Sequence, residues 1–516
     1  MQRDRPPGKG VVVTGRTLTI EEVVRVARFG AGASLSPKAL PRIIESRRVV
    51  EEVVADEKKS YGIRTGFGQL ADIKIPKRDI KRLQVNLLRS HACGAGEPLE
   101  VEEVRAMMLA RANSLANGYS GVRPEVVRML LRLIEKGVVP FVPEYGSLGA
   151  SGDLIPLAHM ALALIGEGTA IRGCERVRSA EALRDAGLSP LSLESKEGIA
   201  LINGTSAMAG IGALLVHDAL DLVRCAEVAG SISLDGLKGS DTPFQERVLK
   251  VKRGEGMLYT GYNVRVLLKG SEIRSSHLDC DRVQDAYTLR CIPQVLGAAR
   301  DVIAHVRGVV EDEMNSTTDN PVIIPESKES LSGGAFHGER IAMAMDYLGL
   351  ALSRVAQFSE RRVARLLDER VSGLPAFLTK EQGVSSGLML LQYLAASLAS
   401  DTKVLAHPSS ADSIPVSANQ EDFVPMGMNS VLKSRRVLKN ARYVVGIELI
   451  CASQAIRFHR PMRSGKGVEL ALECIGKKVR PIEEDRPLSD EVEAVYRMVR
   501  DGELLAHLAK GGMRLR

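Results

Sequence analysis

The feature that most constrains the fold is a set of long helical patterns of apolar residues. The clearest pattern consists of Ile341, Met345, Leu348, Leu352 and Val355, at spacings of four, three, four and three residues. This spacing places all five side chains on one face of an α-helix. We expect that helix to continue through SERRVARLLDERV to Gly373. Long helical patterns of the same kind cover residues 208–229, 282–314, 383–400 and 429–458.

Long helices need packing partners along their length, because a lone helix gains little stability from propensity. The sequence therefore predicts a mainly α fold with a long central helical bundle. Strand-like segments are short, namely GVVVTG near the start and AIRG around Ile171. We expect a mixed N-terminal domain over residues 1–205, a central helical bundle over 206–480 and a C-terminal helical tail over 481–516. Surface loops or insertions are expected at 168–198, 235–280 and 325–335.

The composition is that of a globular protein, and it argues against several classes of function. Apolar residues make up 45% of the 516 residues and charged residues 26%, so the chain can bury a sizeable core. The net charge is 70 − 63 = +7, and the densest basic stretch, Lys433 to Arg442, is helical in pattern with one aromatic residue beside it. We therefore expect no nucleic-acid partner. The longest nearly apolar run, Leu154 to Gly166, is shorter than the ~18 residues that suggest a membrane span, so no membrane is expected either.

The cysteines indicate a reducing compartment. All seven are scattered, without a C-x-x-C pair or the His/Cys spacing of a zinc site. The first ten residues, MQRDRPPGKG, lack the apolar core of a secretory signal. We therefore expect free thiols, no metal and a cytoplasmic protein. One chain offers about five long helices that need partners, so we also expect bundles from several subunits to merge in a homo-oligomer.

The most unusual segment is GSLGASGDLIPLAHMALALIGEG, at residues 146–168. A turn followed by a helix explains most of it, with Asp153 as the N-cap and Pro156 in the first turn. The helix does not explain the three small residues Ala150, Ser151 and Gly152. The segment lacks the final glycine of a G-x-S-x-G nucleophile elbow and the Lys-Ser/Thr of a phosphate-binding loop, which excludes both motifs.

Small residues in a tight turn allow a rarer reaction of the backbone itself. Without a side chain on Gly152, its amide nitrogen can approach the carbonyl carbon of Ala150 closely enough to form a bond. Loss of water then closes a five-membered ring, and dehydration of Ser151 leaves an exocyclic methylidene group. Such a group is an electrophile, and the positive end of a helix dipole favours electron flow into it.

At these residues the sequence resembles the aromatic amino acid ammonia-lyases that carry a 4-methylidene-imidazol-5-one (MIO) group, and most of all their histidine-specific members. The resemblance runs from about residue 10 to the C-terminal tail. Its most specific motifs are ASGD (150–153), QDAYTLRC (284–291), NSTTDNP (315–321) and SANQED (417–422). It implies an aspartase/fumarase-like architecture, an MIO group formed autocatalytically from Ala150-Ser151-Gly152 without an external cofactor, and a homotetramer whose active sites are shared between subunits.

The resemblance also implies catalytic roles for single residues. Tyr61, in YGIRTGFG, matches the base that takes the β-proton of the substrate, and Tyr287 is a second catalytic residue. A free tyrosine has a pKa of about 10, so Tyr61 needs nearby positive charge or helix dipoles to act near neutral pH. Arg290 matches the residue that pairs with the substrate carboxylate, and Phe336 an aromatic residue beside the MIO group. Gln284, Tyr287 and Arg290 follow at intervals of three, so we expect them on one helix face, lining one wall of the site.

Other matched residues are expected to bind the substrate. Asn203 and Asn315 match polar residues near the MIO group and the substrate carboxylate. The pair Ser90-His91 looks like that of the histidine-specific members. Glu421 matches a glutamate that can accept a hydrogen bond from an imidazole N–H group. The resemblance thus implies a lyase that converts the small amino acid L-histidine to trans-urocanate and ammonia.

The sequence departs from the histidine-specific pattern at several positions, among them Arg64, Ser206, Ala335 and Phe423. Ala335 and Phe423 remove polar groups near residues that contact the substrate or support the MIO group. Two alternatives therefore stay open. One is a lyase or 2,3-aminomutase of the same group that acts on another amino acid, such as phenylalanine or tyrosine. The other is a non-catalytic helical scaffold, although a scaffold has no need of a tripeptide that can cyclise.

Overall fold

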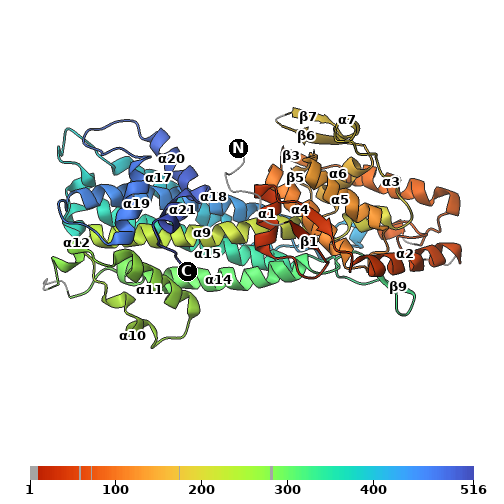
Figure 1. The fold of residues 1–516 in the computed structure, drawn as a ribbon, viewed down its shortest axis with the longest axis horizontal. Helices are drawn as coiled ribbons and strands as arrows, with labels where there is room; N and C mark the ends of the chain where they lie inside the picture. Colours follow the sequence, from red (N-terminus) through yellow and green to blue (C-terminus); the bar gives the residue numbers. More distant parts are fainter. Residues whose placement is uncertain (1–9, 57–59, 71, 174, 279–282) are drawn as a thin grey trace. The chain divides into compact units, whose positions relative to one another are not determined.

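The computed structural model describes residues 10–516 except 57–59, 71, 174 and 279–282, and its helices confirm a mainly α fold (Figure 1). The long helices are α9 (Ser206–Gly236), α14 (Ile292–Met314), α15 (Glu339–Leu367), α17 (Met389–Leu405) and α18 (Gly427–Arg457). They correspond to the five apolar patterns in the sequence. In α15 the clearest pattern is fully buried at all five positions, namely Ile341, Met345, Leu348, Leu352 and Val355. The apolar face of this helix is therefore a packing face, as its spacing predicts.

Two long helices begin later than predicted, each for a local reason. The helix expected from residue 282 begins at Ile292, with Pro293 in its first turn, where a residue without an N–H group is tolerated. Residue 282 lies outside the described residues, and of residues 283–291 only the short helix α13 (Tyr287–Arg290) is helical. The helix α17 begins at Met389 rather than at residue 383. Gly383 and Gly387 have φ angles of +94° and +56°, which lie outside the helical region.

The helix α15 ends earlier than predicted. It was expected to reach Gly373 but ends at Leu367. The side chain of Asp368 accepts a hydrogen bond from the amide of Arg370 and caps a new short helix, α16 (Glu369–Ser372). An aspartate in this capping position competes with continuation of the preceding helix.

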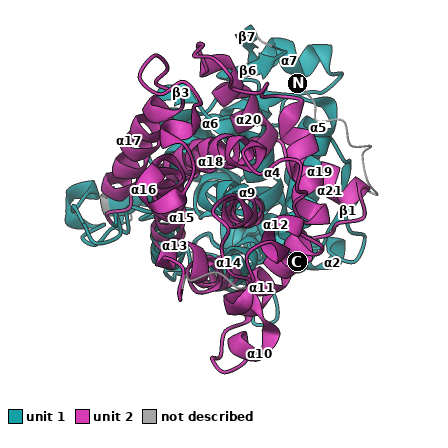
Figure 2. Cartoon of the chain, turned by 90° about the vertical axis from the view of Figure 1, so that its left-hand side faces the viewer, with its two compact units in different colours: residues 1–217, 306–346, 408–432 teal, residues 218–305, 347–407, 433–516 magenta. Residues whose placement is uncertain are grey.

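The internal contacts of the chain divide it into two compact units, coloured separately in Figure 2. Unit 1 comprises residues 1–217, 306–346 and 408–432, and unit 2 comprises residues 218–305, 347–407 and 433–516. The predicted boundaries at 205 and 480 are not those of the units. The chain passes from one unit to the other within α9, α14, α15 and α18 and once more after the end of α17, so neither terminal segment forms a unit by itself. The predicted tail, with α20 (Ser489–Arg500) and α21 (Glu503–Lys510), is part of unit 2.

The strands that the structure describes are short and belong to unit 1. A parallel pair is formed by β1 (Val11–Val13) and β2 (Ala33–Leu35). An antiparallel sheet has the order β4 (Val139–Pro140), β6 (Thr169–Arg172) and β7 (Glu175–Arg178). Two further antiparallel pairs are β3 (Ala95–Pro98) with β5 (Pro143–Tyr145), and β8 (Val322–Ile324) with β9 (Glu329–Leu331). The strand-like segments GVVVTG and AIRG are β1 and β6, as predicted.

Shorter helices complete both units. Those of unit 1 are α1 (Ile20–Phe29), α2 (Leu40–Ala55), α3 (Ile80–His91), α4 (Val101–Ala116), α5 (Pro124–Lys136), α6 (Leu154–Leu164), α7 (Ser179–Asp185) and α8 (Glu197–Ile202), with 3-10 turns η1 (Gly68–Leu70), η2 (Lys77–Asp79) and η5 (Ser417–Asn419). Those of unit 2 include η3 (Thr242–Phe244), α10 (Glu246–Leu249), α11 (Glu255–Leu268), α12 (Glu272–Ser275), η4 (Ala376–Leu378) and α19 (Lys466–Gly476). Surface loops or insertions were expected at 168–198, 235–280 and 325–335. The described residues of these stretches contain β6, β7 and α7 in the first, η3 and α10 to α12 in the second, and β9 in the third.

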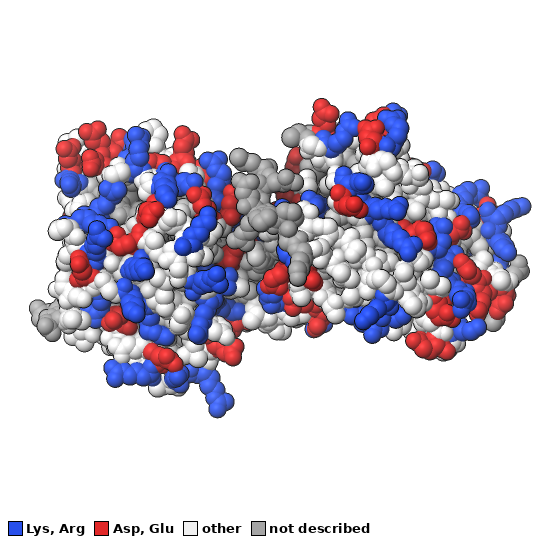
Figure 3. Space-filling model, viewed as in Figure 1, with Lys and Arg blue, Asp and Glu red and all other residues white. Residues whose placement is uncertain are grey.

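One helix of the described residues, α9, is long and apolar enough to cross a membrane by length and composition alone. Of its most apolar 18-residue window, 83% is buried inside the protein. This degree of burial is typical of a helix at the centre of a bundle. Lys and Arg are interspersed with Asp and Glu over the face shown in Figure 3, with uncharged areas between them, a mixture typical of a protein surface.

In unit 2 a buried ion pair joins two of the long helices. Arg362 of α15 donates two hydrogen bonds to Glu448 of α18, from Nε to Oε1 at 2.5 Å and from Nη2 to Oε2 at 2.7 Å. Neither side chain is exposed to solvent. The hydroxyl groups of Ser233 and Ser359 donate to the same carboxylate at 2.7 and 2.6 Å. These donors replace the water that the carboxylate loses on burial.

We expect Arg362→Met to destabilise the protein by about 3 to 5 kcal/mol, because it leaves the carboxylate of Glu448 buried without its cation. The double variant Arg362→Met/Glu448→Leu removes both charges and is expected to recover much of that loss. Denaturant unfolding followed by circular dichroism measures both effects. Equal stability of the wild type and Arg362→Met would show that the ion pair contributes little.

Candidate active site

Residues 149–152 form a tight turn directly before α6. Gly149 and Gly152 pair across it as an isolated antiparallel bridge. Gly152 has a φ angle of +71°, and a Cβ atom on it would lie 2.3 Å from the carbonyl carbon of Gly204. Real Cβ atoms do not approach a backbone atom so closely, so only glycine fits at this position. Ala150 and Ser151 are therefore held in a turn whose ends are fixed by backbone contacts.

Asn203, directly after α8, holds the turn through the carbonyl group of Ser151. Its Nδ2 atom donates a hydrogen bond to the Ser151 oxygen at 2.7 Å, and the amide of Gly204 donates to the same oxygen at 3.4 Å. The Oδ1 atom of Asn203 is buried and has no hydrogen-bond partner among the residues that the structure describes. Because a buried acceptor without a donor costs free energy, this atom is a candidate contact for an N–H group of a ligand.

Asp153 joins the turn to the start of α9. One carboxylate oxygen accepts hydrogen bonds from the amides of Ala207 and Met208, both at 2.9 Å, and the other accepts one from the hydroxyl group of Ser147 at 3.0 Å. Asp153 is the N-cap residue of α6, as predicted, but its side chain makes no capping hydrogen bond there and caps α9 instead. Burial raises the pKa of Asp153 to about 7, although its three hydrogen bonds lower it. Both α6 and α9 begin beside the turn, where their positive ends favour negative charge.

Buried charged side chains support Asn203, the residue that holds the turn at residues 149–152. Arg111 of α4 is fully buried, and its Nη2 atom donates to the carbonyl oxygen of Asn203 at 2.7 Å. Lys196 and Asp319 form a fully buried ion pair at 2.5 Å. Burial lowers the pKa of Arg111 to about 10, while the charges of Asp319 and Asp153 raise it. The sequence analysis missed these residues, although an arginine within MMLARANSLA was a visible signal, since arginine is rarely buried without a partner.

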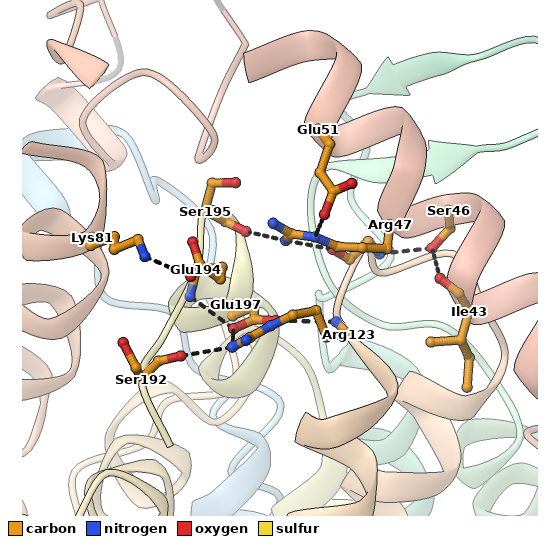
Figure 4. Close-up of polar contacts among 11 residues, drawn as sticks. Ile43, Ser46, Arg47, Glu51, Lys81, Arg123, Ser192, Glu194, Ser195 and Glu197 are labelled. Carbon is orange, nitrogen blue, oxygen red and sulfur yellow. Dashed lines mark hydrogen bonds and ion pairs between the residues drawn. The ribbon is translucent and has the colours of Figure 1, made fainter. Parts of the chain in front are cut away.

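A second polar network fixes the segment that leads into α8 (Figure 4). Arg123 donates to both carboxylate oxygens of the buried Glu197, from Nε at 2.8 Å and from Nη2 at 2.7 Å. Arg47 donates to the carbonyl oxygen of Ser195 at 2.9 Å. Because α8 begins at Glu197, these bonds fix the helix that leads directly to Asn203.

Tyr61 lies in the loop before η1, and its pKa is raised above the usual value. Burial is the main cause, and the charge of Glu421 adds to it, whereas a hydrogen bond from the amide of Gly68 lowers the pKa. That bond joins the Gly68 nitrogen to the Tyr61 hydroxyl oxygen at 3.4 Å. The ring of Phe67 meets the Tyr61 ring edge to face, with the centroids 6.2 Å apart. A tyrosine that acts as a base near neutral pH needs a lowered pKa. The described residues of this one chain have the opposite effect and raise the pKa of Tyr61.

Glu421 connects several of the predicted site residues. Its Oε1 atom accepts a hydrogen bond from the hydroxyl group of Ser151 at 3.0 Å. Its charge raises the pKa of Tyr61 and of His91, which lies at the end of α3. Burial is the largest influence on His91 and lowers its pKa. Hydrogen bonds therefore bring Ser151, Asn203 and Glu421 together in unit 1, and the charge of Glu421 acts on Tyr61 and His91 of the same unit.

The turn that presents Glu421 has an unusual backbone. Ser417, Ala418 and Asn419 have φ angles of +54°, +52° and +66° in succession. Val416 and Glu421 pair across this turn, with N-to-O distances of 3.0 and 3.3 Å. Left-handed conformations cost roughly 1 kcal/mol or more for residues other than glycine, and such strain collects at functional sites.

The segment that contains Phe336 also lies against the turn at residues 149–152. The amide of Gly338 donates to the carbonyl oxygen of Gly149 at 2.9 Å. Phe423, which departs from the family pattern, is 62% exposed and stacks on His337, with ring centroids 6.2 Å apart. The phenylalanine at position 423 thus packs against the ring of His337 and remains largely exposed.

Asn315 has a structural role. Its Nδ2 atom donates to the carbonyl oxygens of Leu18 and Glu311 at 2.8 and 2.7 Å, and its Oδ1 atom accepts from the amide of Leu18 at 2.8 Å. Both N–H groups of the side chain are engaged, so the predicted contact with the substrate carboxylate finds no free donor here. Instead the residue ties the end of α14 to the segment before α1.

Three predicted site residues belong to unit 2. Tyr287 and Arg290 lie in α13, where the guanidinium carbon of Arg290 is 4.7 Å from the Tyr287 ring centroid. Tyr287 is 69% exposed. Gln284 precedes the helix, so the single helical face expected for the three residues is not formed. Their part in the active site stays a prediction.

The chain is similar to known proteins over nearly its whole length. The model of the family described as aromatic amino acid lyase matches residues 18–477. A histidine ammonia-lyase of Caldanaerobacter subterraneus subsp. tengcongensis is 49% identical over 507 residues, which cover 98% of this chain and 100% of that protein.

Two solved structures are similar to the whole fold. Tyrosine aminomutase from Streptomyces globisporus has a TM-score of 0.94 at 35% identity, covering 98% of this chain and 100% of that one. Histidine ammonia-lyase from Trypanosoma cruzi has a TM-score of 0.89 at 37% identity, covering 97% and 95%. The fold is therefore common to lyases and aminomutases. It does not distinguish the two activities, so the distinction has to come from the residues of the site.

The variant Asp153→Asn tests the burial of that carboxyl group. When folding raises the pKa from 3.8 to about 7, the group stabilises the folded protein fully below pH 3.8 and loses that contribution as the pH rises toward 7. Asparagine does not titrate. We therefore expect the melting temperature of the wild type minus that of the variant to fall as the pH rises over this range, measured by differential scanning fluorimetry. Parallel curves would contradict the raised pKa.

Proposed function

The chain belongs to the aromatic amino acid lyase family, and we propose that it removes ammonia from L-histidine to give trans-urocanate. The observation that carries the proposal is the hydrogen bond from Ser151 to Glu421, whose charge also raises the pKa of His91. An imidazole ring can form hydrogen bonds with a histidine and a carboxylate, whereas a phenyl ring cannot. The 49% identity to a protein named histidine ammonia-lyase supports the same substrate.

The proposal includes an MIO group formed from Ala150, Ser151 and Gly152. These residues fit such a group, because Gly152 has no side chain and its contacts with Gly149 and Gly204 hold the ends of the tripeptide close together. When formed, the group supplies an electrophile that turns the substrate amine into a better leaving group. It is made from the chain itself, so no external cofactor is required.

Asn203 has two tasks in this proposal. Its Nδ2 atom and the Gly204 amide hold the Ser151 carbonyl oxygen and withdraw electron density from it. Its unpartnered Oδ1 atom accepts an N–H group of the substrate amine and so orients it. Because both tasks need a planar amide with a donor and an acceptor, neither aspartate nor leucine could replace this residue.

Tyr61 is the proposed base for the β-proton. Since burial and Glu421 raise its pKa, its phenolate needs more stabilisation than the Gly68 amide supplies. We propose that neighbouring subunits complete the site in a homotetramer with shared active sites. In that assembly Arg290 pairs with the substrate carboxylate, while Tyr287, Gln284 and Phe336 line the site.

An exposed apolar stripe on α15 supports association with further copies of the chain. Met343, Tyr347 and Leu350 follow at spacings of four and three residues, and 59%, 48% and 48% of their surfaces are exposed. Large apolar residues exposed on one face of a long helix are typical of a surface that packs against another chain. The stripe thus gives the proposed tetramer a surface with which to form.

A cytoplasmic location is also part of the proposal. The described cysteines are free thiols, namely Cys93, Cys225, Cys291, Cys451 and Cys474. Free thiols are typical of a reducing compartment. Cys174 and Cys280 lie outside the described residues.

An aminomutase is the alternative, and the TM-score of 0.94 to a tyrosine aminomutase favours keeping it. A 2,3-aminomutase returns the amine to the β-carbon of the substrate and yields a β-amino acid. Incubation with L-histidine, L-phenylalanine and L-tyrosine, followed by measurement of ammonia, unsaturated product and β-amino acid, separates the two activities. A β-amino acid product, or faster turnover of another substrate, would replace L-histidine elimination in the proposal.

We expect the mature protein to be lighter than its encoded sequence by two molecules of water, one from ring closure and one from Ser151. Ser151→Ala cannot lose the second water. Intact-mass spectrometry measures both proteins, and the absence of tryptophan lowers the near-ultraviolet background against which the new chromophore absorbs. An unmodified mass for the folded wild type would contradict MIO formation.

We expect Tyr61→Phe to lower kcat and kcat/KM for L-histidine together, by at least about a hundredfold, because a general base acts only in the transition state. Steady-state kinetics of urocanate formation measure the change. The intact mass of the variant is the control and should match the wild type, since Tyr61 takes no part in ring closure. Wild-type kcat in this variant would show that another residue is the base.

A further inference from the structure

Gln84, on α3, is fully buried and forms hydrogen bonds to two other segments of unit 1. Its Oε1 atom accepts from the amides of Gly198 at 2.8 Å and Ile199 at 3.2 Å. Both amides belong to the first turn of α8, whose N-cap residue, Lys196, makes no capping hydrogen bond with its side chain. Gln84 thus satisfies amides that the start of a helix leaves without an intrahelical partner.

The nitrogen of the same side chain faces the segment that carries Tyr61 and η1, residues 61–70, here called the Tyr61 loop. Because Oε1 accepts from two backbone N–H groups, this atom is the oxygen of the side-chain amide, and the orientation of the amide is settled. The Nε2 atom donates to the carbonyl oxygen of Gly62 at 3.4 Å. Gly62 directly follows Tyr61, so Gln84 joins the residue next to the proposed base to the start of α8.

Packing brings the same three segments together. A Cβ atom on Gly198 would lie 2.8 Å from the backbone oxygen of Gln84, so α3 and α8 approach this closely only because Gly198 lacks a side chain. A Cβ atom on Gly62 would lie 3.4 Å from the Cγ2 atom of Ile199, so the Tyr61 loop passes beside that side chain. Ile199 therefore contacts Gln84 through its amide and the Tyr61 loop through its side chain.

Asn203 is fixed by the same helix. Its amide donates to the carbonyl oxygen of Ile199 at 2.9 Å. Its side chain holds the carbonyl oxygen of Ser151 at 2.7 Å. Gln84 therefore connects the loop of the proposed base to the helix whose end holds the tripeptide.

We propose that Gln84 is a positioning residue that fixes the Tyr61 loop against α8, so that Tyr61 and Asn203 keep one relative position. The inference rests on the proposed function, in which Tyr61 takes the β-proton of the substrate and Asn203 orients its amine. Both groups act on one substrate molecule, and a displacement of about 1 Å can lower a rate about a hundredfold. Gln84 acts through the two backbone segments and not by contact with the substrate.

Other contacts hold the Tyr61 loop to the core at different residues. Ile63 is buried in a cluster with Val49, Val50 and Ile323. The amide of Ile75 donates to the carbonyl oxygen of Arg64 at 2.9 Å. The loop should therefore stay folded without the bond from Gln84, with its position relative to α8 no longer fixed.

The variant Gln84→Glu separates the two functions of the side chain. A carboxylate still accepts from the amides of α8, where the positive end of the helix favours it, but it has no hydrogen for the Gly62 oxygen. We expect kcat for L-histidine to fall at least about tenfold with a smaller change in KM, because a displaced base affects the transition state and not substrate binding. Wild-type kcat in this variant would overturn the inference.

An isotope effect identifies the step that is slowed. We expect deuterium at the β-carbon of L-histidine to lower kcat of Gln84→Glu, because removal of the β-proton is then the slowest step. Equal kcat values for the labelled and unlabelled substrates would show that the variant slows a different step, which also overturns the positioning of Tyr61.

The matched control is Gln454→Glu in unit 2. Gln454 is also buried, its Oε1 atom accepts from the amide of Ile482 at 3.3 Å, and its Nε2 atom donates to the carbonyl oxygens of Ile482 and Leu378 at 2.7 and 3.4 Å. Both variants bury a carboxylate, so we expect both to lower the melting temperature. Only Gln84→Glu should lower kcat, counted per protein that has lost two waters by intact mass. Equal losses of kcat would show an effect of destabilisation alone and overturn the inference.

Amide hydrogen exchange followed by mass spectrometry tests the loop without any turnover. We expect Gln84→Glu to exchange faster than the wild type in residues 61–70 and at the wild-type rate in residues 197–202. Gln84→Met has no charge and loses both sets of bonds, so it should exchange faster in both segments, and it replaces Gln84→Glu if that variant does not fold. Wild-type exchange in residues 61–70 would overturn the inference.

These measurements separate the inference from the proposed function. A wild-type protein that forms no urocanate refutes the proposed function, while the exchange of residues 61–70 still decides whether Gln84 holds the Tyr61 loop. A protein that forms urocanate, and whose Gln84→Glu variant keeps the wild-type kcat, refutes the positioning role alone.

Discussion

The close approach of the backbones of Gly152 and Gly204 is the contact on which the rest of the site depends. A Cβ atom on Gly152 would lie 2.3 Å from the Gly204 carbonyl carbon, so the contact exists only because Gly152 lacks a side chain. It brings together the residues that precede two helices, α6 and α9. The carboxylate of Asp153 then accepts hydrogen bonds from two backbone amides in the first turn of α9. The Ser151 carbonyl group and the unpartnered oxygen of Asn203 are placed relative to this contact.

The side chains that support the turn at residues 149–152 include buried charged groups. Arg111 binds the carbonyl oxygen of Asn203, and Lys196 is paired with Asp319 out of reach of solvent. Buried charges cost free energy unless each has its partner, and a hydrogen-bonded network is satisfied in few arrangements. An apolar core of the same volume would tolerate small displacements of the turn. Because Arg111 needs the Asn203 carbonyl oxygen as its partner, a displacement of the Asn203 backbone would break this hydrogen bond and destabilise the folded protein.

The sequence was sufficient to predict helices that follow from a local pattern of apolar residues. It was not sufficient to predict side-chain contacts between residues that are far apart in the chain. The stripe from Ile341 to Val355 predicts α15 because burial on one helix face follows directly from spacing. Asp153 is the N-cap residue of α6 as predicted, but the sequence did not reveal that its side chain binds the amides of Ala207 and Met208, which lie more than fifty residues away in the chain. The convergence of site residues in unit 1 was implied by the resemblance. Asn315 shows the limit of that approach, since a motif match does not reveal that its amide is already engaged.

The turn at residues 149–152 is closed by parts of the chain that are synthesised long after it. The amide of Gly338 binds the Gly149 carbonyl, and the amide of Gly427 binds the neighbouring Leu148 carbonyl at 3.0 Å. Glu421 reaches Ser151 from the same late region. A ribosome must therefore translate 270 residues beyond Ser151 before Glu421 can contact it. Until then the tripeptide lacks these contacts, so we expect the proposed cyclisation to follow the synthesis of Glu421 and Gly427.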